Sequence, residues 1–172
     1  SGETADTLAA MELARDGGAQ LATICNSRGS SAWRLARSRL LTQAGPEIGV
    51  ASTKAFTTQL VALLSMALGL REALGRADHR DAELVAELQR LPLAVEQALA
   101  IDAGRYEIGC ELLSGSTDSL YLGRGILYPI PLEGALKLRE SSYLHAEGYP
   151  AGEMKHGPIA LIEEGFPVVA VV

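Results

Sequence analysis

The sequence contains little cysteine, with Cys25 and Cys110 as the only two thiols among 172 residues. Two cysteines are too few for a disulfide framework or for a metal site built on clustered thiolates. Cys25 lies in a short apolar run, which favours a buried free thiol. The histidine and carboxylate residues show no spacing typical of metal ligands, so we predict no metal site. This composition fits a reducing compartment, and we expect the protein in the cytoplasm.

Basic clusters and long apolar runs are also missing. The formal net charge of −6 and the lack of a basic patch disfavour an electrostatic surface for nucleic acid. The longest apolar run, between Leu60 and Leu70, is interrupted by Ser65 and is too short to span a bilayer. We therefore expect neither nucleic acid nor a membrane as partner. No signal peptide is visible at the start of the sequence. This is weak evidence about targeting, because the first residue is Ser1 and not an initiator methionine.

What the sequence does contain is an alternation of strand-like and helix-like segments. Hydrophobic residues make up 48% of the chain, and Ala, Leu and Val dominate, which is typical of helices packed on a buried parallel sheet. The expected strands cover residues 21–25, 40–42, 119–123 and 167–172, and the expected helices cover 5–15, 34–39, 52–67, 81–91, 92–103, 106–113 and 130–143. This order predicts an α/β fold with doubly wound parallel sheets flanked by helices.

The two strand–helix regions at either end of a helical middle suggest two related subdomains. We place the first at residues 1–103, together with its connecting helices, and the second at residues 104–172. No strand precedes Ser1 and no helix follows Val172, so both subdomains are expected to be truncated.

The most informative segment lies in the helix expected over residues 130–143. Lys137 and Glu140 stand three residues apart and therefore share one helical face. Such pairs are most often surface ion pairs worth roughly a few tenths of a kcal/mol. Here Leu136 and Leu138 flank the pair. A partly buried Glu140 is therefore also a candidate general base.

A histidine follows in a loop bounded by glycine and proline. His156 precedes Gly157 and Pro158, and a histidine side chain titrates close to neutral pH, which suits proton transfer. The alternative is a loop histidine bonded to the backbone. His79 lies among charged residues and is expected to be solvated, whereas His145 is expected to follow the end of a helix and cap it.

Two junctions between a loop and a helix lie further upstream. At the first, the hydroxyls of Ser1 and Thr4 and the free N–H groups of a helix start are suited to a phosphate. At the second, Gly49 lets the backbone approach a ligand, and Ser52 or Thr53 can bind an anion. Simple N-capping is the alternative at both junctions.

Three blocks of the sequence together resemble a known family. They are residues 1–7 (SGETADT), residues 44–56 (AGPEIGVASTKAF) and the segment 123–158. They occur in the same order as in the glutamine–fructose-6-phosphate aminotransferases, also called glucosamine-6-phosphate synthases. The resemblance lies in the sugar-isomerase (SIS) region of that family and covers nearly all of the chain. Long blocks in a shared order are more specific than any single short motif.

The resemblance implies a fold and an activity. The isomerase region of the family consists of two sugar-isomerase subdomains, each a parallel sheet flanked by helices. The family converts fructose 6-phosphate and glutamine into glucosamine 6-phosphate and glutamate, the first step of amino-sugar (UDP-GlcNAc) synthesis, without a metal or redox cofactor. We therefore expect the chain to be the isomerase part of such an enzyme.

The resemblance also assigns roles to three residues of the later blocks. Glu140 matches the base that moves a proton between C1 and C2 of the sugar, and Lys137 matches its neighbour in the site. His156 matches the histidine of sugar-ring opening, which in the family is contributed across a homodimer interface. An aldose–ketose shift needs a base near two adjacent carbons, an acid/base for ring opening and a fixed phosphate, so these roles agree with the residue types.

The earlier blocks supply the substrate-binding residues that the resemblance implies. Ser1 and Thr4 match the phosphate-binding loop of the family. Val50 and Ser52 match residues that contact the sugar phosphate. We expect these four residues to bind fructose 6-phosphate or glucosamine 6-phosphate.

The family has parts that this sequence does not contain. They are an N-terminal glutaminase domain with a cysteine nucleophile, a Ser-Gln pair just before Ser1, and a C-terminal tail with a lysine. We therefore expect the chain to be a fragment whose partner is the glutaminase domain of the same parent chain. Two other functions stay open: a related sugar-phosphate deaminase or deglycase, and a non-catalytic sugar-phosphate-binding module that need not keep Glu140 or His156.

Overall fold

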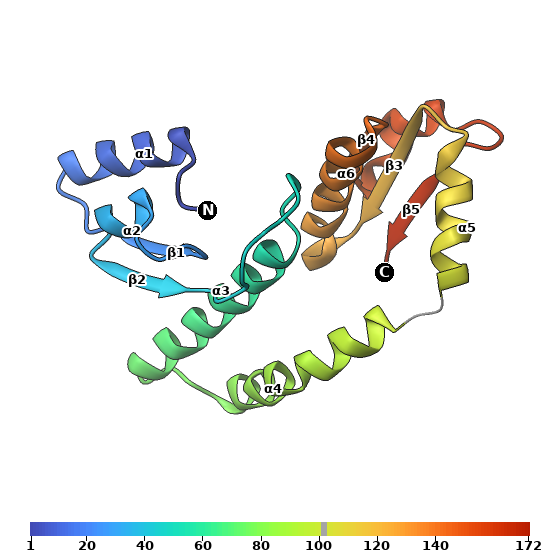
Figure 1. The fold of residues 1–172 in the computed structure, drawn as a ribbon. Coiled ribbons are helices and arrows are strands. Elements are labelled where there is room, and N and C mark those ends of the chain that lie inside the picture. The colour runs from blue at the N-terminus through green and yellow to red at the C-terminus, as the bar shows by residue number, and fades with distance from the viewer. Residues whose placement is uncertain (101–102) are drawn as a thin grey trace. The chain divides into compact units, whose positions relative to one another are not determined.

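The computed structural model of the protein describes residues 1–100 and 103–172. The chain divides into two compact units, Ser1–Glu96 and Gln97–Val172. Parallel strands alternate with helices in each unit (Figure 1), which confirms the expected α/β class. The boundary expected after residue 103 stays a prediction about the functional subdomains. In the described part of the chain, no helix combines the length and the apolar character that a membrane crossing requires.

The first unit is built around two short parallel strands, β1 (Ala22–Cys25) and β2 (Ser38–Leu41). Ala22 pairs with Ser38 and Cys25 with Leu41. Helices α1 (Ala5–Asp16) and α2 (Ser31–Leu35) accompany this pair of strands. The buried residues of the unit are mostly small, and they are Cys25, Ser30, Ala32, Ala36 and Leu68.

Helix α2 begins earlier than the sequence predicted. The hydroxyl of Ser30 accepts a hydrogen bond from the N–H of Trp33 at 3.3 Å. The carboxylate of Glu3 accepts one from the N–H of Ser31 at 2.8 Å. These acceptors satisfy N–H groups of the first turn and fix where the helix starts. The helix expected over residues 34–39 was therefore wrong in its later part, where the chain forms β2.

Two long helices follow, α3 (Lys54–Ala73) and α4 (His79–Leu99). Helix α3 continues through Gly69, where a connection was expected, because a helical glycine costs only about 1 kcal/mol relative to alanine. Helix α4 contains Pro92, where the sequence predicted the start of a separate helix. Proline removes one backbone hydrogen bond, which weakens the helix. Its ring keeps φ near the helical value, and the helix continues through it. Residues 101 and 102, expected to be helical, lie outside the described residues.

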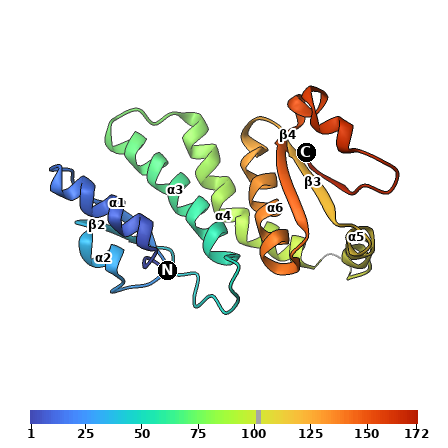
Figure 2. The ribbon, with the colours of Figure 1, turned by 90° about the horizontal axis from the view of Figure 1, so that it is seen from above.

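The second unit is built around three parallel strands in the order β4-β3-β5. The central strand β3 (Asp118–Gly123) pairs with β4 (His145–Pro150) on one side and with β5 (Val168–Val171) on the other. Helix α6 (Pro129–Ser142) packs along β3 and β4, as Figures 1 and 2 both show. The remaining elements are α5 (Ala103–Ser114), η1 (Gly125–Leu127), η2 (Ala151–His156) and η3 (Pro158–Leu161).

The core of the second unit lies where α6 meets the sheet. Leu120 of β3 and Ala146 of β4 are buried there. Pro131 and Ala135 of α6 are buried with them. Because α6 contributes buried residues on one side, its opposite side is free to carry polar residues.

Strand β4 was not predicted. Its sequence, HAEGYP, has no apolar run, and glycine and proline are unfavourable in strands. Packing explains the strand, because a Cβ added to Gly148 would lie 2.8 Å from Cδ2 and 2.9 Å from Cα of Leu132. The glycine thus lets α6 approach the strand closely. The expected helix cap at His145 was wrong, since this residue begins β4 and its N–H donates to the carbonyl of Thr117.

We expect the substitution Gly148→Ala to destabilise the protein by about 1–3 kcal/mol, because the added methyl group would overlap the backbone of α6. Urea denaturation measures this loss. Gly109→Ala in α5 is the matched control, because nothing lies within 4 Å of the added Cβ and alanine favours a helix. Equal losses of stability in the two variants would contradict the packing described here.

Candidate functional site

Helix α6 holds a lysine between two carboxylates. Nζ of Lys137 lies 2.6 Å from Oε2 of Glu140 and 3.4 Å from Oε1 of Glu133. Spacings of three and four residues place all three side chains on one helical face. The hydrogen bond to Glu140 is the main cause that raises the pKa of Lys137, and Glu133 adds to it. The lysine is therefore a stable cation beside the Glu140 carboxylate.

This cluster is partly shielded from water. The exposed fraction of the side chain is 25% for Lys137, 23% for Glu133 and 35% for Glu140. Charges interact more strongly when they are partly removed from water than on an open surface. Glu140 is thus an accessible carboxylate with a lysine partner, a combination that suits a group that takes a proton from a ligand.

Close contacts between α6 and the central strand hold the cluster in place. A Cβ added to Gly123 would lie 2.5 Å from Cγ of Pro131, and one added to Gly134 would lie 2.9 Å from the ring of Tyr121. At its other end, α6 stops at Tyr143, which adopts a left-handed conformation with φ 62°. The backbone of the helix is therefore fixed at both ends of the segment that carries Lys137 and Glu140.

His156 lies in the second unit at the end of η2. Its Nδ1 lies 2.8 Å from Oε2 of Glu153. Gly157 follows with φ +140°, a backbone conformation that residues other than glycine rarely adopt. Pro158 then begins η3. A shallow hollow of about 540 Å³ adjoins this loop, and it is lined by Tyr149, Pro150, Glu153, His156, Gly157, Pro158 and Leu161.

The first loop–helix junction leaves its hydroxyls available. Thr4 is the N-cap residue of α1, yet among the described residues its side chain makes no capping hydrogen bond. Ser1 Oγ accepts a long hydrogen bond, 3.4 Å, from the N–H of Glu3. The loop is anchored to α2, because the carbonyl of Gly2 accepts from the N–H of Ala32 at 3.0 Å. Ser1 and Thr4 thus lie exposed beside a helix start, where the backbone favours an anion.

The second junction is capped by a residue that sequence reasoning missed. The Glu47 carboxylate accepts hydrogen bonds from the N–H groups of Ala55 at 2.8 Å and Thr53 at 3.0 Å. These bonds, the one from Ala55 first, hold the pKa of Glu47 below its usual value. Neither Ser52 nor Thr53 caps α3 in the described structure, so the capping alternative was wrong here. Val50 and Ser52 are exposed in the loop.

The structure brings together only some of the residues singled out by the sequence. Lys137 and Glu140 are in contact, whereas His156 is paired with Glu153. Ser1, Thr4, Val50 and Ser52 belong to the first unit. The roles assigned to all seven residues stay predictions. The sequence analysis missed two partners, Glu133 of Lys137 and Glu153 of His156. Helical spacing could have indicated both, because Glu133 stands four residues before Lys137 and Glu153 three residues before His156.

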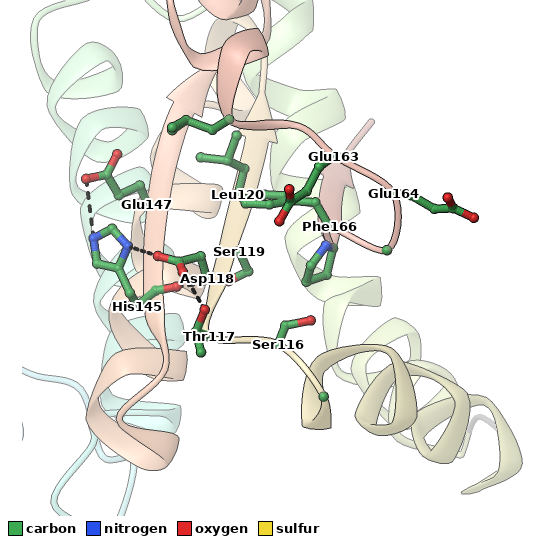
Figure 3. A pocket seen from close by; sticks show the side chains of 14 residues that line it. Ser116, Thr117, Asp118, Ser119, Leu120, His145, Glu147, Glu163, Glu164 and Phe166 are labelled. Atoms are coloured by element: carbon green, nitrogen blue, oxygen red, sulfur yellow. Dashed lines mark hydrogen bonds and ion pairs between the residues drawn. The ribbon is translucent and has the colours of Figure 1, made fainter.

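A second hollow, of about 500 Å³, lies at the amino end of the sheet in the second unit (Figure 3). There His145 Nδ1 lies 2.8 Å from Oδ1 of Asp118, and its Nε2 lies 3.5 Å from Oε1 of Glu147. Glu163 and Glu164 also line the hollow. Four carboxylates disfavour a phosphate, and parallel sheets bind ligands at their carboxyl ends. This hollow is therefore a poor candidate for a sugar-phosphate site.

No group of three or more His, Cys, Asp or Glu side chains within residues 1–100 and 103–172 is arranged to hold a metal ion. The lysine, glutamate and histidine side chains of α6 and η2 can accept, donate or stabilise protons. Such groups act on ligands by general acid–base catalysis.

Comparison with known proteins agrees with this geometry. The model of the SIS domain matches residues 1–69 and 112–172. The chain belongs to the SIS domain family. Over 99% of its length it is 56% identical to the glutamine–fructose-6-phosphate aminotransferase [isomerizing] of Pseudomonas aeruginosa and 54% identical to that of Thermococcus kodakarensis. The chain spans 28% of the length of each of these relatives.

A solved structure shows the same SIS fold. It is the C-terminal domain of glucosamine-fructose-6-phosphate aminotransferase from Francisella tularensis, with a TM-score of 0.94 and 45% sequence identity. The match covers 100% of this chain and 48% of that one. The family and the SIS-type fold inferred from the sequence are thereby confirmed.

The capping role of Glu47 predicts a pH dependence of stability. Its pKa is lower in the folded chain than the value of about 4.3 in an unfolded one, so its contribution is present above that pH. The contribution is lost as the pH falls through the lowered folded pKa. Urea denaturation should show Glu47→Gln to be less stable than the unmodified protein at neutral pH, with the difference shrinking in acid. Glu12→Gln, a similar change on α1, serves as control, and a pH-independent difference for Glu47→Gln would contradict the assignment.

Proposed function

We propose that the chain is the isomerase part of an enzyme that makes glucosamine 6-phosphate from fructose 6-phosphate and glutamine, the first step of amino-sugar (UDP-GlcNAc) biosynthesis. The observation that carries this proposal is the ion pair of Lys137 and Glu140, 2.6 Å apart on one face of α6. It occurs in a SIS chain that is 56% identical to part of a protein named for this reaction.

Glu140 is the base in this proposal. Converting a ketose into an aldose requires a proton to leave C1 and a proton to reach C2, and one carboxylate close to both carbons can do both. Lys137 places a positive charge next to the reacting carbons. That charge stabilises the negative charge that develops on the sugar oxygen when the proton leaves C1. No step of this sequence needs a metal or a redox cofactor.

Other residues hold and open the sugar. Ser1 and Thr4 bind the phosphate beside the start of α1, where N–H groups and the helix dipole favour an anion. Val50 and Ser52 contact the sugar phosphate from the loop before α3. His156 exchanges protons with the ring oxygen and the anomeric hydroxyl, so that the cyclic sugar opens before isomerisation.

We also propose a homodimer with a shared active site, in which His156 acts on sugar bound by the neighbouring subunit. The exposed fraction of its side chain, 72%, leaves it free to reach a ligand outside its own unit. Helix α3 also exposes large apolar residues, which is typical of surfaces that are covered in an assembly. They are Leu60, Leu63, Leu64, Met66 and Leu70.

The remaining partner in the proposal is a glutaminase domain of the same parent chain, which would release ammonia from glutamine. This proposal is supported by the length of the aminotransferases that the chain matches, which are several times longer than the chain.

We place the protein in the cytoplasm. Cys25 and Cys110 are free thiols, and a reducing compartment keeps thiols free.

In the intact protein that carries this sequence, we expect Glu140→Gln to lower the rate of glucosamine 6-phosphate formation about 10²–10⁴-fold, because the base is lost while the shape is kept. Mass spectrometry measures the product, and calorimetry should show nearly unchanged binding of fructose 6-phosphate. Glu107→Gln on α5 removes the same charge at a residue without a proposed role, and this control should keep the rate of the unmodified protein. Undiminished turnover would remove Glu140 from the mechanism, and an unmodified protein that binds the sugar without forming product would favour a deaminase, deglycase or binding module.

Mixed dimers test the shared site. Homodimers of His156→Ala and homodimers of Thr4→Ala should both form glucosamine 6-phosphate poorly. After subunit exchange, some mixed dimers should regain one site with both an intact histidine and an intact phosphate loop. Activity should then recover to roughly a quarter of the unmodified level if subunits pair at random. No recovery after demonstrated exchange would show that each subunit uses its own His156.

A further inference from the structure

We propose that Glu153 is a positioning residue that decides which nitrogen of His156 transfers protons. This inference rests on the proposed role of His156 in opening the sugar ring. Nδ1 of the imidazole lies 2.8 Å from Oε2 of Glu153. An ionised carboxylate can only accept a hydrogen bond, so Nδ1 must carry the proton. The neutral ring then presents Nε2 as its free acceptor.

The backbone builds this pair into the loop. Both residues belong to η2, and a 3₁₀ helix has three residues per turn, so side chains three positions apart lie directly above one another. Pro150 precedes η2, and Gly157 with φ +140° and Pro158 follow it. These residues restrict the chain on both sides, so the carboxylate and the ring meet without help from another element.

Stability does not explain the pair. The exposed fractions of the two side chains are 72% for His156 and 59% for Glu153. A pair this exposed contributes only about 0–1 kcal/mol to folding. Both residues line the hollow of about 540 Å³ beside the loop, where an incoming ligand would meet the ring. An exposed imidazole without a partner would exchange between its two tautomers, and the carboxylate removes that freedom.

The tautomer matters for the chemistry of ring opening. Nε2 takes the proton of the anomeric hydroxyl while the bond between C2 and the ring oxygen breaks. The proton then passes from Nε2 to the ring oxygen, so the net change moves one proton between two oxygens of the sugar. Between these steps the ring is a cation, which the negative charge of Glu153 stabilises. With the proton on Nε2 instead, the first transfer could not begin at that atom.

The test needs a measurement that a merely structural role would not change. Nitrogen and carbon chemical shifts of His156 in the unmodified 172-residue chain, at a pH where the ring is neutral, report its tautomer directly. We expect the form with the proton on Nδ1 in the unmodified chain and in Glu153→Asp. A mixture is expected in Glu153→Gln, because an amide can either accept from Nδ1 or donate to it. Glu164→Gln, a matched change in the same unit, should leave the spectrum of His156 unchanged.

Kinetics of the intact protein complete the test. We expect Glu153→Gln to lower kcat about 10–100-fold, with little change in the binding of fructose 6-phosphate and with partial recovery in Glu153→Asp. A ring with its proton on Nε2 in the unmodified chain, or a Glu153→Gln variant with unchanged kcat in an active protein, would overturn the inference while leaving the proposed function intact. An unmodified protein without turnover would instead refute the proposed function, and the spectrum would still decide the tautomer.

Discussion

The close packing of α6 on the sheet of the second unit is the constraint on which the candidate site depends. Gly123 and Gly148 in the strands and Gly134 in the helix leave room for contacts that a methyl group would block. The helix therefore lies directly against β3 and β4. The same packing fixes Lys137 and Glu140 on the helix and defines β4, the strand that leads into the loop of His156.

Glutamate side chains set the electrostatics of this chain at several places. Glu140 and Glu133 hold Lys137, and Glu153 holds His156, so the lysine and the histidine of the candidate site each have a carboxylate partner. Glu47 performs a related task at the start of α3, where its carboxylate occupies the N–H groups that an anion would otherwise bind. By contrast, the start of α1 lacks a side-chain cap among the described residues, which makes it the better place for a phosphate.

The sequence predicted those features that depend on local spacing. The helix that carries Lys137 and Glu140 and the contact between these two residues follow from positions three apart on an amphipathic segment. Strand β4 could not be predicted, because its glycine and proline oppose a strand, and it depends on pairing with β3 and on the close contact with Leu132 of α6. The cap of α3 was missed for a similar reason, since Glu47 reaches its amides across a loop and not through the expected hydroxyls.

The most direct test of this account follows the proton that Glu140 is proposed to move. The intact protein is given glutamine and fructose 6-phosphate that carries a single deuterium at C1, in either of its two stereochemical positions, and the position of the label in the product is read by NMR and mass spectrometry. Because one carboxylate approaches C1 from one side, the account predicts that one labelled form gives glucosamine 6-phosphate that keeps deuterium at C1, whereas the other form gives product that has lost it from C1. A protein that binds the sugar phosphate but forms no glucosamine 6-phosphate, or equal loss of the C1 label from both labelled forms, would contradict it.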